Sequence, residues 1–364
     1  MVRTGAAALA SLAALLVFGA ASAAGATVIP VMTGLDNPLG LAFGPDRALY
    51  VAEGGRGGPG PPCRVVRGVT QCYGATGAIS RLRNGVQEKW LTGLPSLAPA
   101  GGNDAEAGPQ DIAFQFRSIP FFGRSDAYVT IGVGGNPAIT RAPLGVAGTL
   151  MGKLIKVSGS REITEIADIA AYEEAANPAG GPIDSNPFGI LALSRHRLVT
   201  DAGANAVFSV AGGAVSTVAV FAGRANPTPI GPPFIDSVPT ATAVGPDGAL
   251  YVSELTGVPF LTGFARIHRI APGGSTSVYA TGLTTVVDLA FADDGTLYAL
   301  QHASCGPFFI CPGSIVQVAA SAPHPVVAGG IIRPGGMTIG PDDAFYVTQR
   351  STSAAIGEVL RIEP

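Results

Sequence analysis

One internal repeat restricts the fold of this chain more than any other feature of its sequence. Residues 33–53 contain an apolar segment, a Gly-Pro-Asp turn and a second apolar segment that ends on Glu53. The pattern recurs at 239–254, 281–300 and 333–349, and weaker copies occupy 111–130 and 186–201. Each copy predicts a β-hairpin, because Pro and Gly supply the backbone angles that such a turn requires.

Two further strands follow the hairpin in each unit. Lys153–Val157 and Ala265–Ile270 alternate apolar and polar residues as third strands, and Val215–Val220 is an example of a fourth strand. Six units of four strands, each spanning roughly 40 to 60 residues, are typical of propeller blades. The sequence therefore predicts an all-β fold, a six-bladed β-propeller.

The two ends of the chain complement each other. The last unit stops at Pro364 after three strands, whereas Thr27–Met32 is a lone strand ahead of the first unit. We expect this N-terminal strand to complete the last blade and close the ring, because an open propeller would expose strand edges. Residues 24–364 then form a single domain.

The first 23 residues have the pattern of a signal peptide. Arg3 precedes an apolar stretch that runs from Ala6 to Ala20, and residues 21–23 form a cleavage site of small residues. No later stretch reaches the roughly 18 apolar residues of a membrane helix. We therefore expect a secreted protein, periplasmic or extracellular, that has no membrane span after cleavage and is monomeric.

Charge excludes one class of partner. Charged residues make up 13% of the chain, the net charge is −3, and no run of Lys or Arg occurs. A surface of this kind cannot neutralise phosphates, so nucleic acid is not an expected partner. The expected binding partner is therefore a protein, a glycan or a small molecule.

The four cysteines form two close pairs in Pro- and Gly-rich segments, Cys63 with Cys72 and Cys305 with Cys311. Close pairs in an exported protein predict disulfide bonds. A metal site is the alternative, but it needs further ligands at suitable spacing, and only His302 lies near Cys305. We favour two local disulfides.

Strand order predicts where a ligand would bind. The loops that enter first strands and those that join second to third strands share one face, which we call the top face. The long segments 54–76, 95–110, 132–149, 172–185, 223–239 and 301–312 belong to it, and long loops on a rigid scaffold often carry function. The side chains expected at its channel mouth are Asn37, Glu53, Asp111, Asn186, Asp201, Glu254, Asp288 and Gln301.

Carboxylates and amides that converge in this way suit Ca²⁺, which takes about six to eight oxygen ligands. The candidate ligands are Glu53, Asp111, Asn186 and Asp288. The alternative is that such residues bond their own backbone at strand starts or are solvated at the rim. In the opposite, bottom turns, we expect turn chemistry from Asp46, Asp247, Asp294 and Asp342.

No catalytic constellation is evident. His196, His268 and His324 fall in a turn or on strands away from the top face. That leaves His302 as the only top-face histidine for proton transfer, and a lone histidine in such a loop is more often a surface residue. Residues 170–176 predict a short helix whose Glu173 and Glu174 face solvent.

Several motifs resemble the ScyD/ScyE family of secreted bacterial proteins, which are related to NHL-type propellers. They are Asp36–Asp46, Cys72–Ile79, Asp168–Glu173, Asp184–Gly189 and Glu254–Phe260. The resemblance covers nearly the whole mature chain. It implies a periplasmic or extracellular propeller, and it implies no established catalytic residues.

Two classes of function remain. The first is a non-enzymatic binding module that uses the top face, and the absence of a catalytic constellation favours it. The second is a metal-assisted hydrolase that resembles the gluconolactonase propellers, in which a cation such as Ca²⁺ polarises a carbonyl and activates water. A quinone-dependent sugar dehydrogenase fits less well, because no general-base His with basic partners is apparent.

Overall fold

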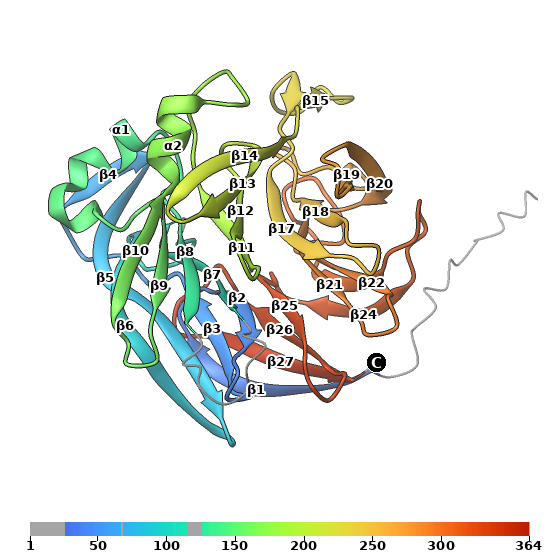
Figure 1. The fold of residues 1–364 in the computed structure, drawn as a ribbon, viewed down its shortest axis with the longest axis horizontal. Coiled ribbons are helices and arrows are strands. Elements are labelled where there is room, and N and C mark those ends of the chain that lie inside the picture. Colours follow the sequence, from blue (N-terminus) through green and yellow to red (C-terminus); the bar gives the residue numbers. More distant parts are fainter. Residues whose placement is uncertain (1–25, 67, 106, 116–125, 364) are drawn as a thin grey trace, which may run out of the picture.

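Each sequence repeat forms the first two strands of one blade. The structure, a computed structural model, describes residues 26–66, 68–105, 107–115 and 126–363. Its strands assemble into six four-stranded antiparallel blades arranged in a ring (Figure 1). The predicted six-bladed β-propeller is confirmed, whereas the expected signal peptide at 1–23 lies outside the described residues.

The first blade comprises β2 (Pro38–Phe43), β3 (Leu49–Glu53), β5 (Val69–Arg83) and β6 (Val86–Pro99). The second comprises β7 (Pro109–Phe114), β8 (Ala127–Ile131), β9 (Lys153–Val157) and β10 (Ile163–Asp168). The third comprises β11 (Pro187–Ala192), β12 (Arg197–Asp201), β13 (Ala206–Ala211) and β14 (Ala214–Val220). The fourth and fifth blades comprise β17 (Pro239–Val244), β18 (Leu250–Glu254), β19 (Ala265–Ile270) and β20 (Thr276–Leu283); β21 (Val286–Phe291), β22 (Leu297–Gln301), β23 (Gly313–Gln317) and β24 (Val326–Ile331). The sixth comprises β25 (Met337–Ile339), β26 (Phe345–Gln349), β27 (Gly357–Glu363) and β1 (Thr27–Leu35).

The N-terminal strand closes the ring. β1 pairs antiparallel with β27, from Thr27 opposite Glu363 to Leu35 opposite Gly357. In Figure 1 the blue β1 lies beside the red β27, so the two ends of the described chain share the sixth blade. The expectation that this strand completes the last blade is confirmed.

The hydrophobic core lies between blades. Six buried clusters are found among the described residues, and each joins side chains of two neighbouring blades. The closing cluster packs Met32 and Leu35 of β1 against Leu41, Leu49 and Val51 of the first blade. Every blade therefore buries both of its faces against its two neighbours.

Hydroxyl groups of second strands add polar links between blades. Thr130 on β8 donates to Phe188 O at 2.5 Å, and Thr200 on β12 donates to Thr240 O at 2.7 Å. Thr348 on β26 donates to Leu39 O at 2.9 Å, which links the last blade to the first. These buried bonds fix the angle between neighbouring blades, because each satisfies a main-chain carbonyl of the next first strand.

The top-face loops contain additional secondary structure. They hold β4 (Cys63–Val66), α1 (Pro137–Thr140), the 3₁₀ helix η1 (Ala142–Gly148), α2 (Ile169–Ala176), β15 (Arg224–Ala225) and β16 (Phe234–Ile235). The expectation of loops at 54–76 and 95–110 is partly wrong, because β4 pairs with a 15-residue β5 and β6 continues to Pro99. The β-branched residues around Gly68 favour strands on both sides of this turn.

We predict that Leu35→Ala destabilises the folded state by about 2–5 kcal/mol, because it leaves a cavity where β1 meets the first blade. Leu35 is fully buried. Urea unfolding measures the effect, and Val28→Ala in the same strand is the control, since Val28 is half exposed. Equal losses in both variants would contradict a closure that depends on the buried side of β1.

Candidate functional site

The side chain at the end of a second strand accepts a hydrogen bond from the segment that enters the first strand of the same blade. We call this contact the strand-end clamp. In the first blade Glu53 Oε2 accepts from Asp36 N at 2.7 Å, and in the third Asp201 Oδ1 accepts from Asn186 N at 2.6 Å. In the fifth blade Gln301 Oε1 accepts from Thr284 N at 2.7 Å. Together with the clamp of the fourth blade, these clamps involve five of the eight predicted channel-mouth residues: Glu53, Asn186, Asp201, Glu254 and Gln301.

The fourth and sixth blades have the same contact. Glu254 Oε1 accepts from the Ser237 hydroxyl at 2.9 Å, and Gln349 Oε1 accepts from Ile332 N at 3.3 Å. Gln349 was missed by sequence reasoning, although its position after Tyr-Val-Thr matches that of the other clamps. The second blade has Ile131 at the equivalent position.

Most clamp carboxylates are further satisfied inside the protein. Glu53 is fully buried and also accepts from the Ser80 hydroxyl and from Lys89 Nζ, each at 2.5 Å. Glu254 bonds to His268 Nε2 at 2.7 Å and to Arg224 Nη2 at 2.8 Å. These contacts direct the carboxylates into the blades, away from solvent.

The two predicted asparagines join neighbouring segments. Asn37 Nδ2 donates to Gly55 O at 2.7 Å and to Gly102 O at 2.8 Å, and its φ of 49° is left-handed. Asn186 Oδ1 accepts from Val133 N at 3.2 Å, which connects the third blade to the second. Whether either residue also contacts a ligand stays a prediction.

Asp111 and Asp288 occupy equivalent positions in the second and fifth blades, which stand opposite each other in the ring. Asp288 accepts from Leu289 N at 2.8 Å and from Met337 N of the next blade at 2.7 Å. Asp111 repeats this geometry with Ile112 N at 2.7 Å and Ile190 N at 2.9 Å. The two carboxyl groups therefore bridge blades around the channel.

Burial controls the protonation of this pair. It raises the pKa of Asp288 to about 7, because the charged form loses its hydration. Burial also raises the pKa of Asp111 well above its usual value, and the like charge of Asp288 adds to this effect. At position 40 in the first blade, a Cβ would lie 1.9 Å from Asp111 Oδ1, so glycine leaves the space that this carboxyl occupies.

Of the four candidate calcium ligands, Asp111 and Asp288 lie close enough for the charge of one to raise the pKa of the other. Glu53 and Asn186 bond within or between blades on the top face, whereas Asp111 and Asp288 bond main-chain amides of opposite sides of the channel. Over the described ranges 26–66, 68–105, 107–115 and 126–363, no group of three or more His, Cys, Asp or Glu side chains is placed to hold a metal ion. Whether these residues hold calcium together with amide or main-chain oxygens stays a prediction.

The bottom turns behave as expected. Asp46 and Asp247 accept from main-chain amides two residues on, at 3.3 and 3.2 Å, and Asp294 does the same at 2.8 Å. Asp342 accepts from the Tyr346 hydroxyl at 3.1 Å. These acids shape turns on the face opposite the long loops.

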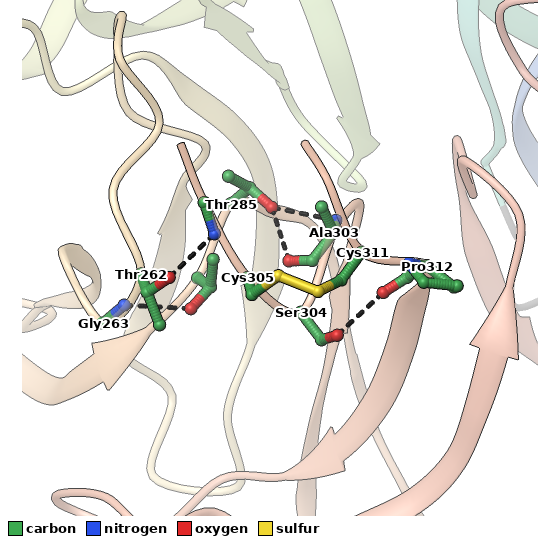
Figure 2. The surroundings of a disulfide bond; sticks show 10 residues. Thr262, Gly263, Thr285, Ala303, Ser304, Cys305, Cys311 and Pro312 are labelled. Carbon is green, nitrogen blue, oxygen red and sulfur yellow. Dashed lines mark hydrogen bonds between the residues drawn. A yellow bond between two sulfur atoms is a disulfide. The ribbon is translucent and has the colours of Figure 1, made fainter. Parts of the chain in front are cut away.

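Both predicted disulfides are present, Cys63–Cys72 and Cys305–Cys311. Figure 2 shows the second, in the loop that joins β22 to β23. Ser304 donates to Pro312 O at 2.8 Å across the base of this loop, and Thr285 Oγ1 donates to Ala303 O at 2.9 Å. The disulfide loop is therefore fixed to the start of the fifth blade, which reduces the entropy lost when a ligand binds it.

A cluster of aromatic and basic side chains lies beside this disulfide. His302 is buried, its Nδ1 lies 2.8 Å from Pro334 O, and its ring meets that of Phe309 at 4.9 Å. The expectation that His302 is a surface residue is wrong, because the loop folds back over it. Burial lowers the pKa of His302 to about 4, so the ring is neutral at pH 7. We call His302, Arg333, Phe309 and Phe260 the blade-five cluster.

A groove of about 660 Å³ lies at the top of the first blade. We call it the Arg56 groove; its wall and floor come from β5, β6, the loop 56–59 and the turn 99–102. Arg56 is 56% exposed at its side chain and its Nε lies 2.9 Å from Asp36 Oδ1. Lys89 lies at the other side of the same groove.

The hairpin of β4 and β5 that borders this groove is anchored to the second blade. Arg64 is buried, and its Nη1 donates to Val133 O at 2.5 Å, while Nε donates to Gln71 Oε1 at 3.2 Å. The loop 56–59 is held as well, because Gly57 N donates to Ser96 Oγ and Gly58 N to Cys72 O, both at 3.0 Å. The groove is therefore a rigid extension of the first blade.

Glu173 differs from its expected solvent-facing position. Its side chain is buried on α2, its Oε2 has no hydrogen-bond partner, and burial raises its pKa to about 7. The charges of Asp201 and Asp184 raise that pKa further. Helical periodicity over only eight residues does not distinguish the buried side of α2 from the exposed one.

Solved structures share the fold of this chain. A streptogramin B lyase superposes with a TM-score of 0.51 at 13% identity over 93% of this chain and 97% of that one. A luciferin-regenerating enzyme gives 0.53 at 8% identity over 93% and 96%, and the soluble aldose sugar dehydrogenase of Escherichia coli gives 0.50 at 12% identity over 93% and 100%.

These likenesses establish the propeller fold and not an activity, because folds of this kind host unrelated functions. No protein-family model matches the chain, and no curated protein matches its sequence. The resemblance to the ScyD/ScyE family therefore stays a prediction. Among the described residues, no helix is long and apolar enough to cross a membrane.

We predict that the free energy of unfolding decreases as pH rises from 5 to 8. The folded state raises the pKa of Asp288 to about 7, whereas an unfolded Asp ionises near pH 4. This side chain therefore contributes stability that is complete below about pH 4 and is lost as pH rises through about 7. Asp201, whose pKa burial raises to about 6, and Glu173 act in the same direction. His302, whose pKa burial lowers to about 4, acts in the opposite direction below about pH 6.5 and offsets part of this loss.

Urea unfolding at pH 5, 6, 7 and 8 measures this slope. Asp288→Asn should reduce it, and Asp294→Asn in the exposed bottom turn of the same blade should leave it unchanged. A stability that rises from pH 5 to pH 8 would show that the channel carboxyls are ionised in the folded protein.

Proposed function

We propose that this chain is an exported binding protein that holds a small polar ligand in the Arg56 groove. The observation that carries the proposal is the groove itself, whose volume of about 660 Å³ falls within the range of about 300–1,000 Å³ found for ligand pockets. Only the first blade, among the described residues, has the β4 and β5 hairpin that builds such a groove.

The chemistry of the groove supports a polar ligand. It offers the hydroxyls of Thr70, Thr76 and Thr92, the cations Arg56 and Lys89, and several glycines whose main-chain groups are accessible. None of the described residues that line it is aromatic. Sugars, sugar acids and amino acids present the matching hydroxyl, carboxylate and amine groups.

Two observations support the remaining parts of the proposal. The disulfides Cys63–Cys72 and Cys305–Cys311 suit an oxidising compartment such as the periplasm or the extracellular space. The clamp carboxylates and channel aspartates are bonded to main-chain groups, so a ligand meets loop side chains first. The hydrolase alternative needs oxygen ligands that converge, and no contact in the described residues favours it.

A thermal-shift screen of sugars, sugar acids and amino acids tests the proposal. A ligand at about 100 times its Kd stabilises the folded state by about 2.7 kcal/mol, which raises Tm by several degrees. Ala75→Trp fills the groove, because Ala75 is exposed and lines it. We expect this variant to lose the shift that the best compound produces in the wild type.

Ala214→Trp is the matched control, because Ala214 is also an exposed strand alanine and lies outside the groove. It should keep the full shift. A compound that stabilises wild type, Ala75→Trp and Ala214→Trp equally would place the binding site elsewhere, and a screen without any stabilising compound would contradict the assigned ligand class.

A further inference from the structure

Four arginines lie over aromatic rings in the described part of the chain, and the guanidinium of one of them makes neither a hydrogen bond nor an ion pair. Arg81 pairs with Glu88, and Arg224, which lies 4.0 Å from the Phe264 ring centroid, pairs with Glu254 at 2.8 Å. Arg197 lies over Tyr128 and bonds to Gln115. Arg333 lies 5.3 Å from the Phe309 centroid and has no hydrogen bond or ion pair from its guanidinium to any described residue.

The unpaired guanidinium of Arg333 lowers the stability of the folded state. Its Nη1 atom is buried without a hydrogen-bond partner, and a buried donor without a partner destabilises the folded state. Burial lowers the pKa of Arg333, and the charge of Asp104 opposes this only in part. The fold pairs Arg224 with an internal carboxylate, but it supplies none to Arg333.

The surroundings of Arg333 would accept a flat apolar group. Phe260 and Phe309 stack with their centroids 4.1 Å apart, and Phe308 and Ile310 on the same disulfide loop are 52% and 70% exposed. Phe308 N donates to Pro259 O at 3.0 Å, which joins this loop to the fourth blade. The result is an aromatic surface beside a cation, which suits an amphiphilic anion.

The backbone of this surface is strained. Phe260, Phe308 and Phe309 have φ values of 59°, 58° and 56°, a left-handed conformation that bulky residues rarely adopt. Strain of this kind destabilises the folded state and concentrates at functional sites, including those that hold ligands. The Cys305–Cys311 disulfide and the bond from Gly306 N to Thr262 Oγ1 at 2.7 Å hold the strained loop in place.

His302 completes the polar side of the cluster. Its Nδ1 is committed to Pro334 O, so Nε2 is the ring nitrogen that remains, and no described residue bonds to it. The neutral ring adds no second positive charge beside Arg333. Because Nδ1 carries the proton that Pro334 O accepts, Nε2 of the neutral ring is an acceptor, and an anion in the cluster takes its hydrogen bonds from the Arg333 guanidinium and not from His302.

We infer that the blade-five cluster binds a small organic acid, whose carboxylate pairs with Arg333 and whose flat apolar body lies against Phe309 and Phe308. The ligand supplies the carboxylate that Glu254 supplies to Arg224. This site is separate from the Arg56 groove, and it does not rest on the function proposed for that groove.

Isothermal titration calorimetry with benzoate tests this inference, and benzamide is the neutral probe of the same shape. We expect saturable binding of benzoate that is at least about tenfold tighter than that of benzamide, because only the carboxylate makes a charge-assisted pair with arginine. Arg333→Met should weaken benzoate binding by about tenfold or more, and Arg333→Lys should give an intermediate affinity.

Stability separates a binding role from a structural one. Because Arg333→Met removes a half-buried guanidinium whose Nη1 has no hydrogen-bond partner, we expect its Tm to equal or exceed that of the wild type. Arg269→Met, at an exposed bottom-turn ion pair with Asp247, should leave benzoate affinity within about twofold of the wild type. Ala75→Trp should also keep benzoate binding, whatever happens to ligands of the Arg56 groove.

Three results would overturn the inference. They are equal affinities for benzoate and benzamide, unchanged benzoate affinity in a folded Arg333→Met variant, and no saturable benzoate binding to the wild type. A large fall in the Tm of Arg333→Met would likewise assign Arg333 to the structure of the loop.

Discussion

The strand-end clamp organises the top face of this propeller. In five of the six blades, the last side chain of the second strand accepts a hydrogen bond from the segment that enters the first strand. These bonds satisfy donors that would otherwise be buried without partners, so each acid or amide is required by the fold. The long loops can then vary without disturbing the ring, because the clamps fix both strands from which they emerge.

The sequence predicted the architecture well because the repeat, the turns and the lone N-terminal strand are local patterns. It predicted the site less well because the roles of Glu53, Asp201 and Gln301 depend on contacts with main-chain groups 15 to 17 residues away. Position along a strand placed these residues on the correct face and left the direction of their oxygens undetermined. The burial of His302 and Glu173 likewise depends on how loops pack, which periodicity in short segments does not report.

Two loop extensions carry the chemistry that the clamps leave available. The first blade extends as the β4 and β5 hairpin with Cys63–Cys72 and borders the Arg56 groove. The fifth blade extends as the Cys305–Cys311 loop and holds the strained phenylalanines next to Arg333. In both places a disulfide lies next to a cation, the exposed Arg56 in one and the half-buried Arg333 in the other, so rigid loops and cations occur together. We therefore place ligand recognition in the loops and stability in the strand ends.

Calcium titration tests this division most directly. The top-face carboxylates and the channel aspartates already bond to main-chain and side-chain donors. We therefore expect added Ca²⁺ to leave Tm unchanged and elemental analysis to find no stoichiometric calcium. A calcium-dependent rise in Tm of several degrees that is abolished by Asp111→Asn or Asp288→Asn would contradict it. That result would show that these oxygens are ligands of a cation and not bridges between blades.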